Sequence, residues 1–218
     1  MASKLSAISI ACAVTLTGCA EPVEVEEVVV AQEDDGMVLD ITVPQVEGLD
    51  GFNEEALRLG EQLEAQTRQS EQAVTEGYTD VHADGEMNFE TKLLDTETIS
   101  VLLNGVLYEA GAAHGYTYKE TLNYELQSGS AIKMIDLFEG ENYEANLLAA
   151  VNQEMEASGL KENLSFPFDQ IKEGQQFYLT EQELVLVFDQ YEITSGSMGP
   201  QEVAILKSEL ENLKDIYK

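Results

Sequence analysis

Gly111-Ala112-Ala113-His114-Gly115 separates two runs of strand-like sequence, and this arrangement decides the fold class. Apolar side chains recur at every second position in residues 99–103, before the glycine-bounded turn, and in residues 116–126, after it. Such alternation is typical of strands that bury one face. Residues 87–93 alternate in the same way, and Asp95-Thr96 predicts a hairpin turn. Consecutive strands joined by short turns predict largely antiparallel sheets.

Helical signals occur in three places. Asn53 is a plausible helix N-cap before residues 57–63, and Gly77 is a plausible stop. Asn142 can cap a second helix whose apolar residues recur every fourth position, and Ser208 with Glu211 has the spacing of a capping box for a third. Many strands with about three helices predict an α+β fold. We expect two small subdomains that share an interface, residues 37–126 and 127–218.

The first eighteen residues have the features of a lipoprotein signal peptide. Lys4 supplies a positive charge, an apolar run of twelve residues ends at Leu16, and Leu16-Thr17-Gly18-Cys19 follows. Twelve residues are too few to span a bilayer as a helix. We predict that Cys19 is lipidated, which anchors the protein outside the cytoplasm to the cell membrane or an outer membrane. Simple cleavage at Ala20 and an uncleaved segment are the alternatives.

Residues 19–36 are rich in acids, and we expect them to form an extended tether. The Val-Glu-Val alternation in this segment also fits an edge strand, but the charges make that the weaker prediction. The whole chain has 11 basic and 42 acidic residues and a formal net charge of −31. This charge argues against nucleic acid as a partner. It fits either an adaptation to saline or alkaline surroundings or the attraction of a cationic partner.

The Gly111–Gly115 segment, with Asp136-Leu137-Phe138, resembles the Gly-Gly-Ala-His-Gly signature of the RsiV-type ectodomain family, the extracytoplasmic module of a lysozyme-sensing anti-sigma factor. A similar module is found in the peptidoglycan deacetylase PdaC. The resemblance extends from about Val38 to Leu213 and includes, in order, Thr42–Leu49, Phe177–Thr180, Leu184–Phe188, Tyr191–Ile193 and Gly199. Ala112 departs from the family pattern, as does the loop at residues 194–198.

The resemblance implies lysozyme, a cationic protein, as the partner, and it indicates which residues make contact. Near the signature these are Gly111, His114 and Gly115, and in the second subdomain they are Tyr191, Glu192, Ser195 and Ser197. Each also has a structural interpretation. The His114 imidazole could fix its own loop by a hydrogen bond, Tyr191 could be a half-buried strand end, and the serines could belong to a loop without a binding role.

Motifs for catalysis or metal binding are weak. Residues 80–91 imitate a calcium loop, but the twelfth position holds Thr91 where a bidentate glutamate is needed. Ser195-Gly196-Ser197-Met198-Gly199 lacks the first glycine of a nucleophile elbow. We therefore expect no catalytic residue, no metal and no cofactor.

From the sequence we expect a non-catalytic, membrane-anchored lipoprotein that binds lysozyme or a similar cationic wall hydrolase. One alternative is an envelope protein that binds the glycan of peptidoglycan. Another, from a different class, is a hydrolase that uses a pair of carboxylates, which the abundance of acids leaves open.

Overall fold

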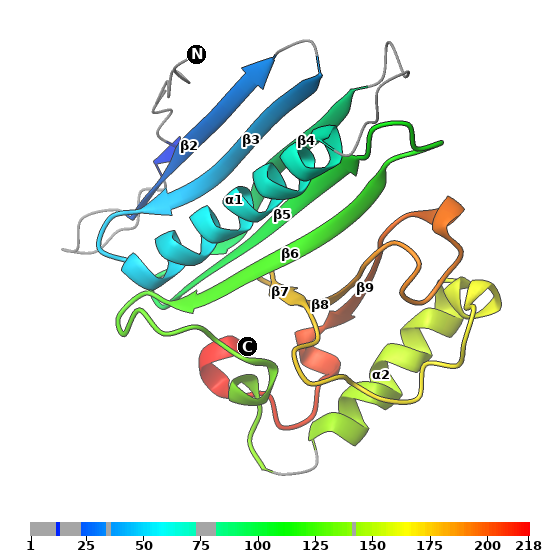
Figure 1. Ribbon diagram of the computed structural model, residues 1–218. Helices are drawn as coiled ribbons and strands as arrows, with labels where there is room; N and C mark the ends of the chain where they lie inside the picture. Colours follow the sequence, from blue (N-terminus) through cyan, green and yellow to red (C-terminus); the bar gives the residue numbers. More distant parts are fainter. Residues whose placement is uncertain (1–11, 14–22, 34–35, 73–81, 141–142) are drawn as a thin grey trace. The chain divides into compact units, whose positions relative to one another are not determined.

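The computed structural model describes residues 12–13, 23–33, 36–72, 82–140 and 143–218 (Figure 1). Cys19 lies outside these residues, so its lipidation stays a prediction. In the described ranges, no helix is both long and apolar enough to cross a membrane. The chain divides into two compact units. The first unit comprises residues 1–90 and 103–117, and the second comprises residues 91–102 and 118–218.

The larger sheet has the strand order β1-β2-β3-β4-β5-β6. Its strands are β1 (Cys12–Ala13), β2 (Glu24–Glu33), β3 (Met37–Val46), β4 (Ala83–Leu94), β5 (Thr98–Tyr108) and β6 (Tyr116–Glu125). Residues 24–33, which we expected to form a tether, are therefore a strand. β2 pairs antiparallel with β3, with Val28 opposite Val43. The ladder satisfies the backbone of β2, in which Val25 is buried between the exposed Glu24 and Glu26 and residues 28–30 are partly buried valines.

Helix α1 (Asp50–Gln72) connects β3 to β4, and these two strands are parallel. In Figure 1 it crosses one face of the sheet, and its buried residues form one stripe: Phe52, Ala56, Leu59, Gly60, Leu63 and Thr67. The helix begins at Asp50, three residues before the predicted cap. Asn53 instead bonds the backbone of Val46, accepting from its N–H and donating to its C=O, each at 2.8 Å. A crossover helix explains why β3 and β4 are parallel in a sheet that we expected to be largely antiparallel.

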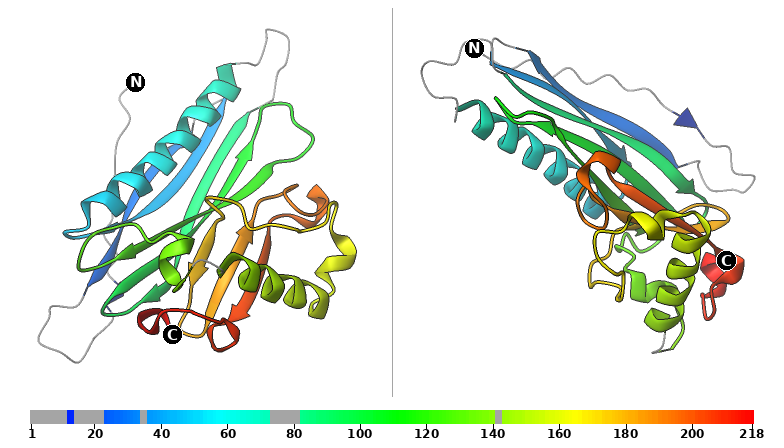
Figure 2. Two further views of the ribbon diagram at one scale, coloured as in Figure 1. Left: turned by 90° about the horizontal axis from the view of Figure 1, so that it is seen from below. Right: turned by 90° about the vertical axis from the view of Figure 1, so that its right-hand side faces the viewer.

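The second unit contains helix α2 (Tyr143–Ala157) and a sheet of strand order β7-β8-β9. The strands are β7 (Phe177–Leu179), β8 (Glu183–Phe188) and β9 (Gln201–Leu206), each antiparallel to its neighbour. The predicted face of α2 is confirmed, because Tyr143, Leu147, Val151 and Met155 are all buried. They share one core with side chains of the small sheet, beside which α2 lies in all three ribbon views (Figures 1 and 2).

The predicted third helix is wrong. Residues 207–209 and 215–217 form only short 3-10 turns, and the chain between them pairs with an earlier segment. Leu213 forms a bridge with Phe138, and the Glu139 N–H donates to the Asn212 carbonyl at 2.7 Å. Leu210, Leu213 and Tyr217 are nevertheless buried, as the helical pattern required. The observed elements confirm the α+β class.

A buried polar network fastens β7 inside the second unit. The Ser100 hydroxyl donates to the Asn123 Oδ1 atom at 2.5 Å and accepts from the Leu179 N–H at 2.9 Å. The Asn123 amide in turn donates to the Phe177 carbonyl at 2.7 Å. Ser100 and Asn123 are almost fully buried, so each bond satisfies a group that water cannot reach.

Candidate functional site

The loop between β8 and β9, residues 189–199, holds the predicted residues of the second unit. It begins with a turn in which the Glu192 N–H donates to the Asp189 carbonyl at 3.0 Å. The Glu192 carboxylate accepts from the Asp189 N–H at 2.9 Å and from the Lys172 ammonium at 2.7 Å. Between them Tyr191 has φ +71°, in the left-handed region that side chains rarely adopt. The turn thus holds Tyr191 in a strained conformation, with Glu192 fixed beside it.

The Tyr191 ring lies directly over Gly196. A Cβ atom at Gly196 would lie closer than 3.0 Å to the Tyr191 ring atoms, so only glycine permits this position of the ring. The Gln190 amide donates to the Gly196 carbonyl at 2.7 Å, and the hydroxyls of Ser195 and Ser197 are 3.0 Å apart. Tyr191, Ser195 and Ser197, which the resemblance indicated together, belong to one folded loop.

Apolar side chains are exposed on and beside the 189–199 loop. Tyr191 is 52% exposed and Met198 is 40% exposed. Phe166, at 72%, follows a segment that pairs with the loop, since the Ser165 N–H donates to the Ile193 carbonyl at 2.8 Å. Exposed aromatic and methionine side chains on a fixed frame are typical of protein-binding surfaces.

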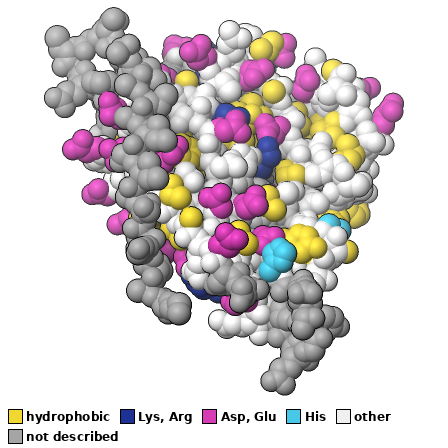
Figure 3. Space-filling model, turned by 90° about the horizontal axis from the view of Figure 1, so that it is seen from above, with side chains coloured by type: hydrophobic (Ala, Val, Ile, Leu, Met, Phe, Trp, Pro, Cys, Tyr) yellow, Lys and Arg dark blue, Asp and Glu magenta, His cyan; other side chains and the backbone are white. Residues whose placement is uncertain are grey.

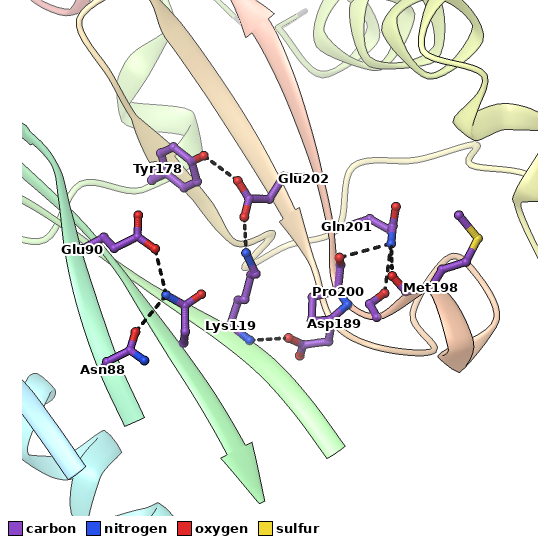
Figure 4. Close-up of polar contacts among 11 residues, drawn as sticks. Asn88, Glu90, Lys119, Tyr178, Asp189, Met198, Pro200, Gln201 and Glu202 are labelled. Atoms are coloured by element: carbon purple, nitrogen blue, oxygen red, sulfur yellow. Dashed lines mark hydrogen bonds and ion pairs between the residues drawn. The ribbon is translucent and has the colours of Figure 1, made fainter. Parts of the chain in front are cut away.

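A charged cluster lies under one end of the loop (Figure 4). The Lys119 ammonium pairs with Glu202 on β9, and the Tyr178 hydroxyl donates to the same carboxylate at 2.6 Å. Burial alone would raise the pKa of Glu202, but the Lys119 and Tyr178 hydrogen bonds and the charges of Lys119 and Lys92 together lower it. Sequence analysis missed this cluster. The only hint was Lys119 itself, because the other charged residues of β6 are acidic.

Asp189 connects the cluster to the loop. Its Oδ1 atom accepts from the Lys119 backbone N–H at 2.9 Å. Burial raises the pKa of Asp189, and the Lys119 N–H opposes that rise while the neighbouring Glu192 charge adds to it. The Asp189 carboxyl thus fixes the start of the loop to β6. Because its pKa is raised, it is also the acid of this loop that is most suited to donate a proton.

The predicted signature residues lie in the first unit, in the turn between β5 and β6. Gly111 has φ +81°, which explains a glycine at this position. The Ala112 carbonyl accepts from the Tyr108 hydroxyl at 2.6 Å, and His114 is exposed, with its Nδ1 atom 3.1 Å from the Gly115 carbonyl. A Cβ atom at Gly115 would make ordinary van der Waals contacts.

A hollow of about 450 Å³ adjoins this turn within the first unit. Its lining is mostly polar: Gln66, Gln69, Ser70, Leu107, Glu109 and Ala110. The Ser70 hydroxyl accepts from the Ala110 N–H at 2.9 Å, which joins the end of α1 to the start of the turn. In the part of the chain that the structure describes, no group of three or more histidine, cysteine or acidic side chains has the arrangement of a metal site.

The 189–199 loop falls within a segment recognised by a family model. Residues 135–208 match the family described as "Protein of unknown function (DUF3298)". This segment is a DUF3298 domain. It includes α2, β7, β8, the loop and β9 but ends before residues 210–217.

Two curated proteins of Bacillus subtilis (strain 168) are related to the chain. Peptidoglycan-N-acetylmuramic acid deacetylase PdaC is 32% identical over 146 residues, which cover 61% of this chain and 29% of PdaC. Anti-sigma-V factor RsiV is 26% identical over 200 residues, which cover 84% of this chain and 68% of RsiV. The predicted resemblance is confirmed. The matched region spans less than a third of the deacetylase.

Two solved structures share the fold. One is a DUF3298 family member from Bacteroides fragilis, with a TM-score of 0.62 at 17% identity, covering 88% of this chain and 94% of that one. The other is a DUF3298 family protein from Pseudomonas aeruginosa, with a TM-score of 0.64 at 16% identity, covering 97% and 95%. At these identities the likeness concerns the fold alone.

Proposed function

We propose that this chain is a non-catalytic, extracytoplasmic binding protein that is anchored through a lipid on Cys19 and binds lysozyme or a similar cationic wall hydrolase. The relation to RsiV and PdaC supports a place at the cell envelope, because PdaC is named for peptidoglycan, an envelope polymer. The single observation that carries the proposal is the 189–199 loop, which presents Tyr191 and Met198 on a fixed frame in a protein of net charge −31.

The negative net charge of the protein would attract a basic partner. On the face shown in Figure 3, acidic side chains are widespread and lysines and arginines are few. Three positive charges of the second unit are already balanced, since Lys119, Lys161 and Lys172 each pair with a glutamate of the same unit. The outward field is therefore negative and accelerates the approach of a basic protein.

The exposed apolar residues provide the contact. Phe166, Tyr191 and Met198 belong to residue types that are enriched at protein interfaces. The hydrogen bonds of Glu192 and Gln190 hold the loop before any partner arrives, which lowers the entropy lost on binding.

The test is calorimetric titration of a soluble form that begins at Ala20 with a cationic lysozyme, at low and at high salt. An equally basic protein of unrelated fold is the control. Saturable one-to-one binding that the control lacks, and that weakens as salt rises, is expected. Equal heats with the control protein would reject specific binding and leave only charge attraction.

The non-catalytic part of the proposal has its own test. A hydrolase would need a pair of carboxylates, and Asp189, whose pKa burial raises, lies close enough to Glu192 for the two charges to interact. We expect the protein alone to release no soluble product from peptidoglycan. Turnover that disappears in Asp189→Asn and in Glu192→Gln would establish a hydrolase instead.

A second candidate function is recognition of peptidoglycan glycan, and the hollow in the first unit favours it. Amides of Gln66 and Gln69, with the Glu109 carboxylate, offer the hydrogen-bonding groups that sugar hydroxyls need, in a volume typical of small-ligand sites. Glycan binding would persist at high salt because the ligand is largely neutral. Sedimentation with insoluble peptidoglycan, comparing Gln69→Ala with Gln153→Ala on α2, distinguishes this function from binding of a basic protein.

A further inference from the structure

A second pocket, within the second unit, has a volume of about 230 Å³ and is built from chain segments far apart in sequence. The β4–β5 hairpin contributes Leu93, Leu94, Asp95 and Thr98 to the lining. The β7–β8 hairpin contributes Leu179 and Glu181, and Lys207 directly follows β9. Residues 216–218 complete the lining. Leucine side chains make part of the wall apolar, and the remainder carries charges of both signs.

Lys207 is the unusual member of this lining. It is only 7% exposed, although lysines are almost never buried without a partner. Among the residues that the structure describes, no carboxylate oxygen lies within 4.0 Å of its ammonium group. Its backbone N–H donates to the Gln182 carbonyl at 2.8 Å, so the residue is held at the pocket. Burial lowers the pKa of Lys207, against the opposing charges of Asp95 and Glu181.

The two acids are also held in place. The Asp95 Oδ1 atom accepts from the backbone N–H groups of Glu97 and Thr98, at 2.8 Å and 2.7 Å, which leaves its second oxygen available. Glu181 lies in a turn closed by the Thr180 hydroxyl, which accepts from the Glu183 N–H at 2.9 Å. The pocket therefore combines one largely buried lysine, whose ammonium group still reaches solvent, with two carboxylates on short, hydrogen-bonded turns.

We propose that this pocket binds the zwitterionic head group of an α-amino acid, with the carboxylate at Lys207 and the ammonium group at Asp95 and Glu181. A simple anion would meet the negative charges of Asp95 and Glu181, and a simple cation would meet the positive charge of Lys207. A zwitterion satisfies both signs at once and supplies the missing partner of Lys207. The volume suits a small amino acid beside the apolar wall. A free amino acid and a peptide side chain with the same head group share this chemistry.

The test is titration of the soluble protein with free alanine, followed by amide chemical shifts in two-dimensional NMR. We expect saturable shifts at Asp95, Thr98 and Glu181, below about 20 mM ligand. Acetate and methylammonium, which each carry half of the head group, should bind at least about tenfold more weakly. A peptide that carries a diaminopimelate side chain is the second arm. Binding of this peptide but not of alanine would assign the site to peptides.

Lys207→Met removes the ammonium group but keeps an unbranched apolar chain, and it should weaken alanine binding by about tenfold or more. Lys161→Met, on an exposed lysine, is the matched control and should bind alanine as the unmodified protein does. The thermal midpoint of Lys207→Met should not fall, because a buried charge is removed. Unchanged binding in Lys207→Met, equal binding of acetate, or no shifts with either ligand would overturn the proposal. None of these outcomes depends on the lysozyme experiment.

Discussion

Substituting Gly196 by alanine offers a sharp test of the proposed contact surface. The new Cβ atom would lie closer than 3.0 Å to the Tyr191 ring, where ordinary contacts are 3.4–4 Å. Gly196 has no positive φ, so the alanine backbone itself is unstrained. Because the ring is half-exposed, it can move outward more easily than the loop can deform. The substitution therefore displaces Tyr191 without removing any atom of it.

The magnitude follows from the exposed area of Tyr191. A tyrosine side chain offers about 200 Å² in all, so its 52% exposure leaves roughly 100 Å² for a partner. At about 25 cal/mol per Å², covering that area contributes about 2.5 kcal/mol, or roughly seventyfold in affinity. The free energy of unfolding should change by less than about 2 kcal/mol, since lost ring packing is offset by the lower chain entropy of alanine in the unfolded state.

The assay is calorimetric titration with lysozyme, paired with urea denaturation of each variant. Tyr191→Ala should lose about as much affinity as Gly196→Ala, while Tyr191→Phe keeps the ring and should lose less. Gly115→Ala makes the same chemical change in the first unit, where the new Cβ atom has ordinary contacts. If Gly196→Ala binds lysozyme within twofold of the unmodified protein, Tyr191 is not a contact. Lost binding in Gly115→Ala alone would place the contact in the first unit.

Three further predictions concern the frame of the second unit. Ser100→Ala strands the buried Leu179 N–H and should cost about 2–4 kcal/mol of unfolding free energy in urea denaturation, far more than an exposed serine. Asp189→Ala should cost about 1–3 kcal/mol, whereas Asp189→Asn keeps the acceptor and removes a charge disfavoured by burial, so its midpoint should equal or exceed the original. The pKa of Glu202 is lowered in the folded protein, so its ionised form stabilises the fold fully above pH 4.5. This stabilisation is lost as the pH falls through the folded pKa. Urea denaturation between pH 5 and pH 3 should therefore depend less on pH in Glu202→Gln than in the unmodified protein.

Secondary structure could be predicted from the sequence where residues close together in the chain decide it. The four-residue spacing of Tyr143, Leu147, Val151 and Met155 gave both the helix α2 and its buried face. The same logic failed at residues 208–217, where the inward-facing residues are buried by a bridge to Phe138 instead. A capping-box spacing cannot reveal that another segment will satisfy the backbone better.

The candidate site was predicted only in part, for a similar reason. Tyr191, Ser195 and Ser197 are close in sequence and could be grouped. The conformation of their loop, however, depends on Gly196 fitting under the Tyr191 ring. The Lys119–Glu202 pair joins residues more than eighty positions apart, and no local periodicity encodes it. The Lys207 pocket likewise requires three turns to meet, which only the fold establishes.

Salt should affect stability and binding in opposite directions, because both depend on the same excess of acids. A net charge of −31 means that acidic side chains repel one another in the compact state, so screening should stabilise the fold. The Debye length falls from about 10 Å to about 3 Å between 0.1 M and 1 M salt, which also removes long-range attraction of a basic partner. Over that range the urea midpoint should rise while the association rate with lysozyme falls. If the midpoint rises and the association rate stays constant, the charge serves solubility in saline surroundings, and the apolar loop alone must explain binding.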